Sequence, residues 1–287
     1  MTAQNAREKA KKNIPGTAIA YLFSFLLFIT LTLTVLCFNI KFILISEDFM
    51  LARLDSSGYY EITYNGILES YENIGVPLGI PGEAFEQSFN VHMVRQDVNR
   101  SAAALYSGNN NFTVNADALR ASLENVFGRL LPDAPPGEDI DSGVIAAVQD
   151  YCVSLYESVM QIPFAKEISS YITKIGGIIN LLLAACIATT ILFSCILVLV
   201  KRSDSAEYIF QAVAASGLLY FTASGFLILR APYRLLNLGA EPLYRLAVDF
   251  AESGLSAIFI CGIVMLTAGI AGTVILIIRK KAGRILV

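Results

Sequence analysis

Two serines have the small neighbours that an exposed nucleophile would need. Ser216 and Ser224 each lie between an alanine and a glycine in an apolar stretch of the chain. A serine nucleophile also requires a base within reach. The only histidine, His92, lies in a different and more polar part of the chain. We therefore expect these small residues to serve close helix packing instead of hydrolysis.

Metal and nucleotide chemistry find little support in the residue types. A zinc site needs several His, Cys or carboxylate ligands at short spacing, but Cys152 is the only cysteine outside the apolar segments. Neither a His-Glu-x-x-His helix nor a Gly-x-x-x-x-Gly-Lys loop occurs. The sequence predicts no catalytic residue, no cofactor and no zinc centre.

One acidic loop has the residue types of a cation site, because carboxylates are the ligands that hard cations prefer. The loop lacks the regular one-three-five spacing of a calcium-binding hand, so we interpret it as a solvated loop, with structural calcium as the alternative. Its carboxylates are Asp133, Glu138, Asp139 and Asp141.

The composition is that of a membrane protein. Apolar residues make up 55% of the 287 residues, charged residues only 16%, and the mean hydropathy is +0.59. Ordinary soluble domains carry about a quarter charged residues. The net charge of −3 excludes a strongly basic nucleic-acid-binding protein.

Four segments are long and apolar enough to cross a bilayer as helices, which takes about 20 residues each. Little in the rest of the chain indicates strands. The sequence therefore predicts an all-α membrane protein with four transmembrane helices. The predicted spans are 17–45, 175–200, 208–229 and 255–278.

Lysine and arginine near the helix ends predict the orientation, because these residues are retained on the cytoplasmic side. They are concentrated in the tail 1–16, the turn 201–207 and the tail 279–287. We therefore expect both termini in the cytoplasm of a multi-pass plasma-membrane protein. The segment 46–174, with 18 acidic and 7 basic residues, and the loop 230–254 then lie outside.

The outside segment 46–174 shows helical periodicity and almost no alternation, so we expect a small helical domain. A first helix is expected before the Gly/Pro-rich stretch at 75–82, as an outward continuation of the first span. A second helix is expected over 83–106. Two further helices follow, and we interpret the apolar stripes as packing faces and not as ligand sites. The third stripe is Leu119, Leu123, Val126, Phe127 and Leu130, and the fourth is Val144, Val148, Cys152, Leu155 and Val159.

Small residues at a spacing of four allow helix backbones to approach closely in a membrane. We expect them to pack the four spans together, with a helix of a partner protein as the alternative. The candidate packing residues are Ala184, Ala188, Gly217, Gly225, Ala268 and Gly272.

Three arginines lie outside, against the usual charge bias, in the leucine-rich loop 230–254. Arg230, Arg234 and Arg245 are expected to dock this loop on the acidic outside domain. Lipid headgroups are an alternative partner for the three side chains, and the sequence favours neither.

The order of one span, a large outside segment, two spans, a small outside loop and one span resembles the FtsX/MacB type of ABC-transporter permease, in topology alone. That resemblance implies a cytoplasmic ATPase as partner. The stretch from Leu78-Gly-Ile-Pro81 through Val98 to Val114-Asn-Ala-Asp-Ala-Leu119 also resembles uncharacterised bacterial membrane proteins of similar length. The second resemblance implies no activity.

Together these patterns favour a non-enzymatic plasma-membrane protein whose helical outside domain binds or senses a ligand or partner, within a larger membrane assembly. The alternative is a permease-like subunit of an ABC-type transport or signalling complex. The expected partners are membrane lipid and another membrane protein. We expect no binding to nucleic acid.

The orientation can be tested with cysteines introduced into a cysteine-free variant. A cysteine in the loop 133–141 should react with a membrane-impermeant maleimide on intact cells, because the positive-inside rule puts this loop outside. A cysteine in the turn 201–207 should react only after permeabilisation. The reverse pattern of labelling would refute the orientation.

Overall fold

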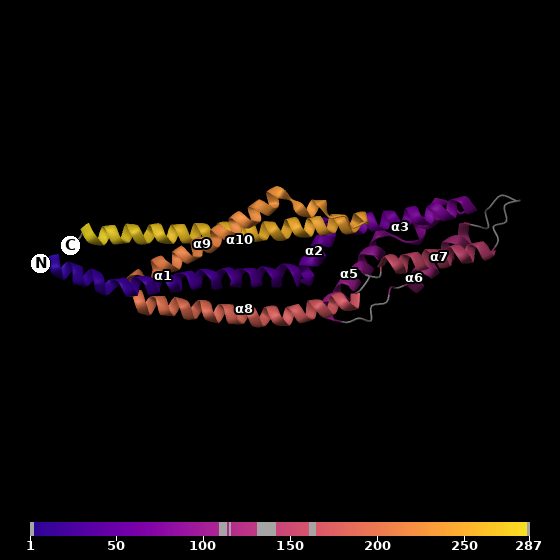
Figure 1. The fold of residues 1–287 in the computed structure, drawn as a ribbon. Coiled ribbons are helices and arrows are strands. Elements are labelled where there is room, and N and C mark those ends of the chain that lie inside the picture. The colour runs from indigo at the N-terminus through magenta and orange to yellow at the C-terminus, as the bar shows by residue number, and fades with distance from the viewer. Residues whose placement is uncertain (1–2, 109–113, 115, 131–141, 161–164, 286–287) are drawn as a thin grey trace. The chain divides into compact units, whose positions relative to one another are not determined.

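The computed structural model describes residues 3–108, 114, 116–130, 142–160 and 165–285, and every regular element in this part of the chain is helical. Short 3₁₀ or π segments at Ile40–Leu44, Val76–Leu78, Arg202–Asp204 and Pro232–Leu235 join the α-helices (Figure 1). The α-helices are α1 Ala3–Asn39, α2 Glu47–Ser56, α3 Tyr59–Gly75, α4 Gly82–Ser88, α5 Val91–Ser107, α6 Ala116–Leu130, α7 Ser142–Met160, α8 Ala165–Lys201, α9 Ser205–Arg230 and α10 Glu241–Ile285.

The chain forms two compact units. The first, which we name the four-helix unit, consists of Met1–Leu44, Gly176–Leu235 and Ala251–Val287. The second, which we name the helical domain, consists of Ile45–Ile175 and Leu236–Phe250. The beginning of α10 thus belongs to the helical domain, although most of this helix belongs to the four-helix unit.

Within the described residues, four helical stretches are long and apolar enough to cross a membrane, as the four predicted spans require. In an apolar 18-residue window of each stretch, between 11% and 28% of the residues are buried inside the protein, so most side chains in these windows are at least partly exposed. Apolar side chains facing outward in this way are the expected surface of a helix in contact with lipid. The stretches are Thr17–Leu44, Ser169–Lys201, Ser205–Leu235 and Glu241–Ala282.

Glycines bring α9 and α10 into direct backbone contact. A Cβ atom added at Gly217 would lie 2.3 Å from the backbone nitrogen of Leu266. A Cβ at Gly262 would lie 2.6 Å from the nitrogen of Phe221, and one at Gly269 would lie 2.5 Å from the nitrogen of Ala214. Only glycine fits at these positions, because real Cβ atoms do not approach backbone atoms so closely.

Hydroxyl groups join α1 to α9 within the same unit. Ser216 Oγ donates to the Phe28 carbonyl at 3.2 Å and to the Ala212 carbonyl of its own helix at 3.0 Å. The Tyr220 hydroxyl donates to the Thr32 carbonyl. Hydrogen bonds of this kind stabilise helix pairs in a membrane, where water offers no competing partner.

Charged residues gather where α8 turns into α9. Lys280, near the end of α10, pairs with Asp204 at 3.0 Å and with Glu207 at 2.7 Å. Lys201 Nζ donates to Thr17 Oγ1 at 2.9 Å. The turn 201–207, the start of the first span and the end of the last span therefore lie at one end of the four-helix unit.

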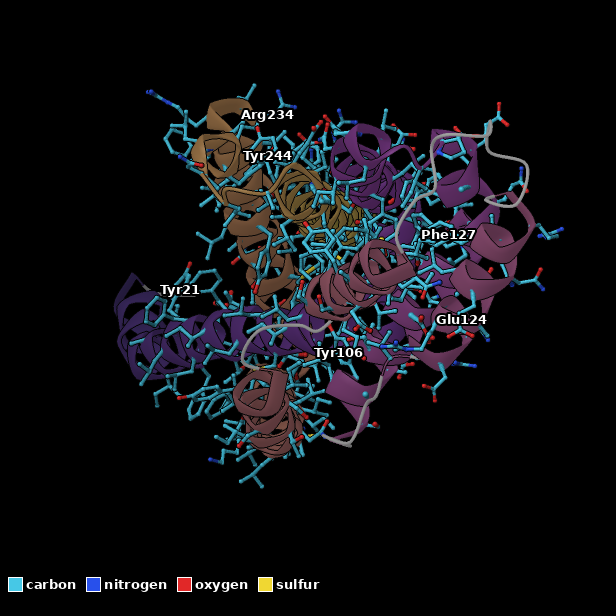
Figure 2. All side chains as sticks on the ribbon, turned by 90° about the vertical axis from the view of Figure 1, so that its right-hand side faces the viewer. Tyr21, Tyr106, Glu124, Phe127, Arg234 and Tyr244 are labelled. Atoms are coloured by element: carbon cyan, nitrogen blue, oxygen red, sulfur yellow. The ribbon has the colours of Figure 1, made fainter. Side chains whose placement is uncertain are left out.

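Aromatic side chains form the core of the helical domain. Tyr71 lies 5.8 Å from Phe85 and 5.3 Å from Phe89, between ring centroids, and Phe85 meets Phe127 edge-on at 5.6 Å. Figure 2 shows Phe127 directed into the domain, whereas the exposed Glu124 of the same helix points outward. The predicted α6 stripe is confirmed for the members whose burial is described, namely Leu119, Leu123, Val126 and Phe127.

The fourth predicted stripe was right only in part. Val148 and Cys152 of α7 are buried in the core and Val144 and Leu155 pack against it, as expected. Tyr156 and Met160 are buried there as well. Val159 is 41% exposed. The buried face of α7 therefore turns toward Tyr156 and Met160 in its second half.

Two predicted helices of the domain are interrupted. The helix expected over 83–106 breaks into α4 and α5, because Phe89 and Asn90 are extended and Asn90 Oδ1 caps α5 by accepting from the Met93 N–H at 3.1 Å. The first span does not continue outward as one helix either. Ser46 caps the separate helix α2, and Gly58, with a φ of +68°, starts α3 in the left-handed conformation.

The loop expected over 230–254 also differs from the structure. Its second half is the first part of α10, which begins at Glu241 with an acidic first turn that suits the helix dipole. The irregular chain is confined to 231–240, which includes the short helix Pro232–Leu235.

Substituting Gly217 should destabilise the four-helix unit. Gly217→Ala places a methyl group against the α10 backbone, and overpacking of this kind costs about 1–3 kcal/mol. Gly177→Ala in α8 is the matched control, because nothing lies within 4 Å of the added Cβ. Thermal unfolding of the detergent-solubilised chain should show a lower Tm for Gly217→Ala alone, and equal Tm values would contradict the close contact.

Candidate ligand-binding cavity

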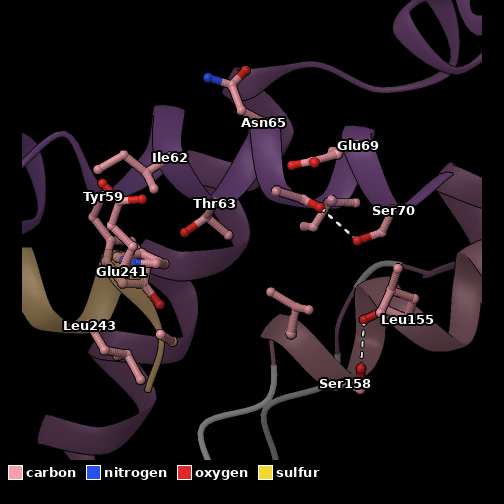
Figure 3. A pocket seen from close by; sticks show the side chains of 15 residues that line it. Tyr59, Ile62, Thr63, Asn65, Glu69, Ser70, Leu155, Ser158, Glu241 and Leu243 are labelled. Carbon is pink, nitrogen blue, oxygen red and sulfur yellow. Dashed lines mark hydrogen bonds between the residues drawn. The ribbon is translucent and has the colours of Figure 1, made fainter. Parts of the chain in front are cut away.

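A cavity of about 680 Å³ lies in the helical domain between α3, the second half of α7 and the first turn of α10. We name it the α3–α7 cavity. Figure 3 shows its lining side chains, with Thr63 and Glu69 on α3, Ser158 on α7 and Glu241 on α10. Pockets that bind small organic molecules have volumes of about 300–1,000 Å³, so this cavity is of suitable size.

The two long walls of the cavity are held together through Tyr71. This side chain of α3 is fully buried, and its hydroxyl donates to the Cys152 carbonyl of α7 at 2.7 Å. Burial raises the pKa of Tyr71, so the phenol stays protonated and continues to donate.

The third wall is anchored by the residues that follow it in α10. Asp249 accepts from Ser56 Oγ at 2.7 Å and pairs with Arg53 of α2 at 3.4 Å. Phe250 meets Phe49 edge-on, with centroids 5.0 Å apart, and Leu246 is buried in the core. These contacts hold the first turn of α10 at the mouth of the cavity.

Much of the cavity surface is apolar. The apolar lining comes from Ile62 and Ile67 of α3, Leu155 and Val159 of α7, and Leu243 of α10. Leu155 and Val159 belong to the stripe that the sequence predicted to be a packing face. Both residues also line the cavity. The sequence holds a signal for this, because α7 carries apolar residues on more than one face and the core covers only one face.

Two of the four hydroxyl groups that line the cavity are bonded to backbone. Ser70 Oγ donates to the Gly66 carbonyl at 2.8 Å, and Ser158 Oγ donates to the Leu155 carbonyl at 2.7 Å. Such bonds back to the helix are the ordinary state of a serine on a helical segment. These two side chains therefore have little need of a ligand.

Thr63 differs from these two serines. Its side chain is buried, with the residue only 4% exposed, and its Oγ1 has no hydrogen-bond partner among the described residues. Burial raises the pKa of Tyr59, and the neighbouring Thr63 hydroxyl offsets part of this rise without reaching hydrogen-bond geometry. A buried polar group without a partner costs about 1–3 kcal/mol, so it is rare in folded proteins.

The charged groups lining the cavity are carboxylates. Glu69 has no ion pair within the part of the chain that the structure describes. Glu241 pairs with Arg245 of its own helix at 2.7 Å. None of the lining residues is Lys, Arg or His.

A second set of buried polar groups serves the core. The Tyr156 hydroxyl donates to Asp97 Oδ2 at 2.8 Å, and the Tyr60 hydroxyl donates to Asn99 Oδ1 at 2.7 Å. Burial raises the pKa of Tyr156, and the bond to Asp97 raises it further. The two bonds join α7 and α3 to α5, and both phenols have a partner.

Each of the three arginines predicted to dock the loop has a partner, four residues away for Arg245 and Arg230 and 18 residues away for Arg234. Arg234 pairs with Glu252 at 2.6 Å, Arg245 pairs with Glu241, and Arg230 lies over the Phe226 ring at 5.6 Å from its centroid. Docking of these arginines on the acidic domain stays a prediction. The contact between α2 and Asp249, in which Arg53 takes part, was not foreseen from the sequence.

The predicted small residues occupy different environments. Gly217 and Gly272 lie at the α9–α10 contact, where a Cβ at Gly272 would lie 2.4 Å from the Phe210 ring, and Gly225 lies under the Phe259 ring at 3.3 Å. The structure leaves Ala184, Ala188 and Ala268 exposed. Their predicted role in packing the four spans together, with a partner helix as the alternative, stays a prediction.

The remaining candidate residues are the two serines of the spans and the carboxylates of the acidic loop. Ser216 and Ser224 donate to backbone carbonyls of the spans. The loop residues Asp133, Glu138, Asp139 and Asp141 lie outside the described residues. Within the described residues, no three His, Cys, Asp or Glu side chains converge on a possible metal site.

Comparison with protein-family models, curated proteins and solved structures found no match for this chain. The two resemblances noted in the sequence therefore stay predictions, and the function must be argued from the cavity.

The buried Cys152 of α7 should make the stability of the helical domain sensitive to alkaline pH. Burial raises the pKa of the Cys152 thiol from its ordinary value of 9.0 to about 12. Between these two values the unfolded chain loses the thiol proton and the folded chain keeps it. Stability is therefore complete below pH 9 and falls with rising pH by about 1.4 kcal/mol per unit for this group.

Cys152→Ala removes this titration, so the variant should lose stability less steeply above pH 9 than the parent does. Thermal unfolding of the detergent-solubilised chain from pH 8 to pH 10.5 would measure both slopes. Identical slopes would show that the thiol does not keep its proton in the folded domain.

Proposed function

We propose that this chain is a non-enzymatic, multi-pass plasma-membrane protein whose helical domain binds a small molecule outside the cytoplasm. The observation that carries the proposal is the α3–α7 cavity, which combines apolar walls with a buried hydroxyl that has no partner. Pockets with a few polar groups among apolar walls are the usual form of small-molecule sites.

The orientation in this proposal comes from the distribution of Lys and Arg, which favours cytoplasmic termini. Four helices able to span a membrane are compatible with it, since an even number of spans returns the chain to the side where it began. The ion pairs of Lys280 with Asp204 and Glu207 also support it, because they join two segments assigned to the cytoplasmic side.

A role in a larger assembly is the second part of the proposal. Exposed small residues on α8, Ala184 and Ala188, support it, because they would let the helix of another membrane protein approach closely. Binding of a ligand in the helical domain would then be sensed by such a partner.

The cavity can be closed with one substitution. Gly66 lines the cavity, and nothing lies within 4 Å of a Cβ added there, so Gly66→Trp introduces an indole into open space. We expect the parent protein, purified from its native host in mild detergent, to retain a small molecule that Gly66→Trp has lost. Mass spectrometry of the extracted protein measures this.

Gly128→Trp on α6 is the matched control, since its Cβ also meets nothing within 4 Å and it lies away from the cavity. It should retain the same molecule as the parent. If both variants retain what the parent retains, the cavity binds no ligand and the proposal fails.

A further inference from the structure

The cavity accommodates some ligand charges better than others. No Lys, Arg or His lines the cavity, whereas Glu69 and Glu241 do. An anionic ligand would meet the Glu69 carboxylate, which has no ion pair among the described residues, whereas Glu241 is already paired with Arg245. The electrostatic field of Glu69 therefore opposes an anionic ligand.

The amino end of α10 could attract an anion, because helix amino ends carry a partial positive charge. The chain already satisfies this end. Glu241 supplies a carboxylate in the first turn, and Pro242 has no N–H to donate. The Arg245 guanidinium that faces this turn is paired with Glu241.

The Thr63 hydroxyl offers a ligand one hydrogen bond, which it can either accept or donate, so the charge around it decides which ligand group it suits. Its oxygen can accept a hydrogen bond, and the described protein supplies it with no partner. Figure 3 shows this oxygen on the side of Thr63 that faces Tyr59 and Glu241. A ligand N–H group placed there would satisfy the hydroxyl and would lie in a negative field.

We propose that the α3–α7 cavity binds an organic amine, a small molecule with an apolar body and one protonated amino group. The inference rests on the proposed function, since it names the chemical class of the ligand. The apolar body contacts Ile62, Ile67, Leu155 and Val159, and the ammonium donates to Thr63 Oγ1. The unpaired charge that favours the ammonium is that of Glu69, because Glu241 is paired with Arg245.

Three probes of matched shape test the class: 4-phenylbutylamine, 4-phenylbutanol and 4-phenylbutyrate. They share one apolar body and differ in a cationic, neutral or anionic head. Binding to the full detergent-solubilised chain is measured by ligand-observed NMR, with Gly66→Trp in the same detergent as the blank. We expect the amine to bind about fivefold more tightly than the alcohol, and the carboxylate to bind most weakly.

Two pairs of variants locate the amine. Glu69→Gln should weaken binding of the amine about threefold and leave the alcohol unchanged, because an exposed carboxylate contributes modestly. Glu61→Gln is its control, since Glu61 is an exposed carboxylate of α3 outside the lining, and it should change neither probe.

Thr63→Val should leave the Tm of the ligand-free protein equal or higher, because it removes a buried hydroxyl that has no partner. It should also weaken binding of the amine, which a purely structural role for Thr63 would not do. Ser70→Ala is its control, since that hydroxyl is already bonded to Gly66 and its loss should leave the affinity within about twofold.

The outcomes separate the inference from the function on which it rests. Equal binding of all three probes, abolished by Gly66→Trp, would show an apolar ligand site and overturn the amine alone. Tighter binding of the carboxylate would also overturn it. A third outcome is that no probe binds the parent differently from Gly66→Trp, although the parent retains a co-purified molecule that Gly66→Trp lacks. In that case the cavity is a ligand site, but its ligand is not an amine.

Discussion

The hydrogen bond from the Tyr71 hydroxyl to the Cys152 carbonyl is the contact on which the helical domain most depends. A phenol of this size can be fully buried only if its O–H finds a partner, and here the partner is a backbone oxygen of the facing helix at 2.7 Å. The ring also contacts Phe85 and Phe89, so one side chain links α3, α4 and α7. Because the bond joins α3 to α7, it also determines the spacing of the two walls of the cavity.

The same rule explains why Thr63 stands apart. Tyr60, Tyr71 and Tyr156 are all buried, and all three hydroxyls donate to a protein oxygen. A domain that satisfies its larger buried phenols so completely has left one small hydroxyl without a partner, on the wall of its cavity. The contrast is what a binding site requires, because a ligand can supply a hydrogen bond that the protein withholds.

The four-helix unit obeys a different constraint. Its outward surface is apolar and its helices gain little from burying that surface against each other, so contact relies on small residues and hydroxyls. Gly217, Gly262 and Gly269 allow the backbones of α9 and α10 to touch, and Ser216 and Tyr220 donate across to α1. Ser216 thus acts in packing, which is the interpretation that its small neighbours favoured in the sequence.

Composition and periodicity were sufficient for the four spans, the helical character of the chain and the buried face of α6, because hydropathy and 3.6-residue spacing depend only on local sequence. They were insufficient at Asn90, where a cap ends one helix and begins another, and at Glu241, where α10 starts inside an expected loop. Composition and periodicity did not predict the cavity either. Whether Leu155 and Val159 pack in a core or line a pocket depends on what α3 and α10 bring opposite them, and only the tertiary structure brings those helices together. Thr63 is one of many threonines in the sequence, and it became distinct only when folding buried its hydroxyl without a partner.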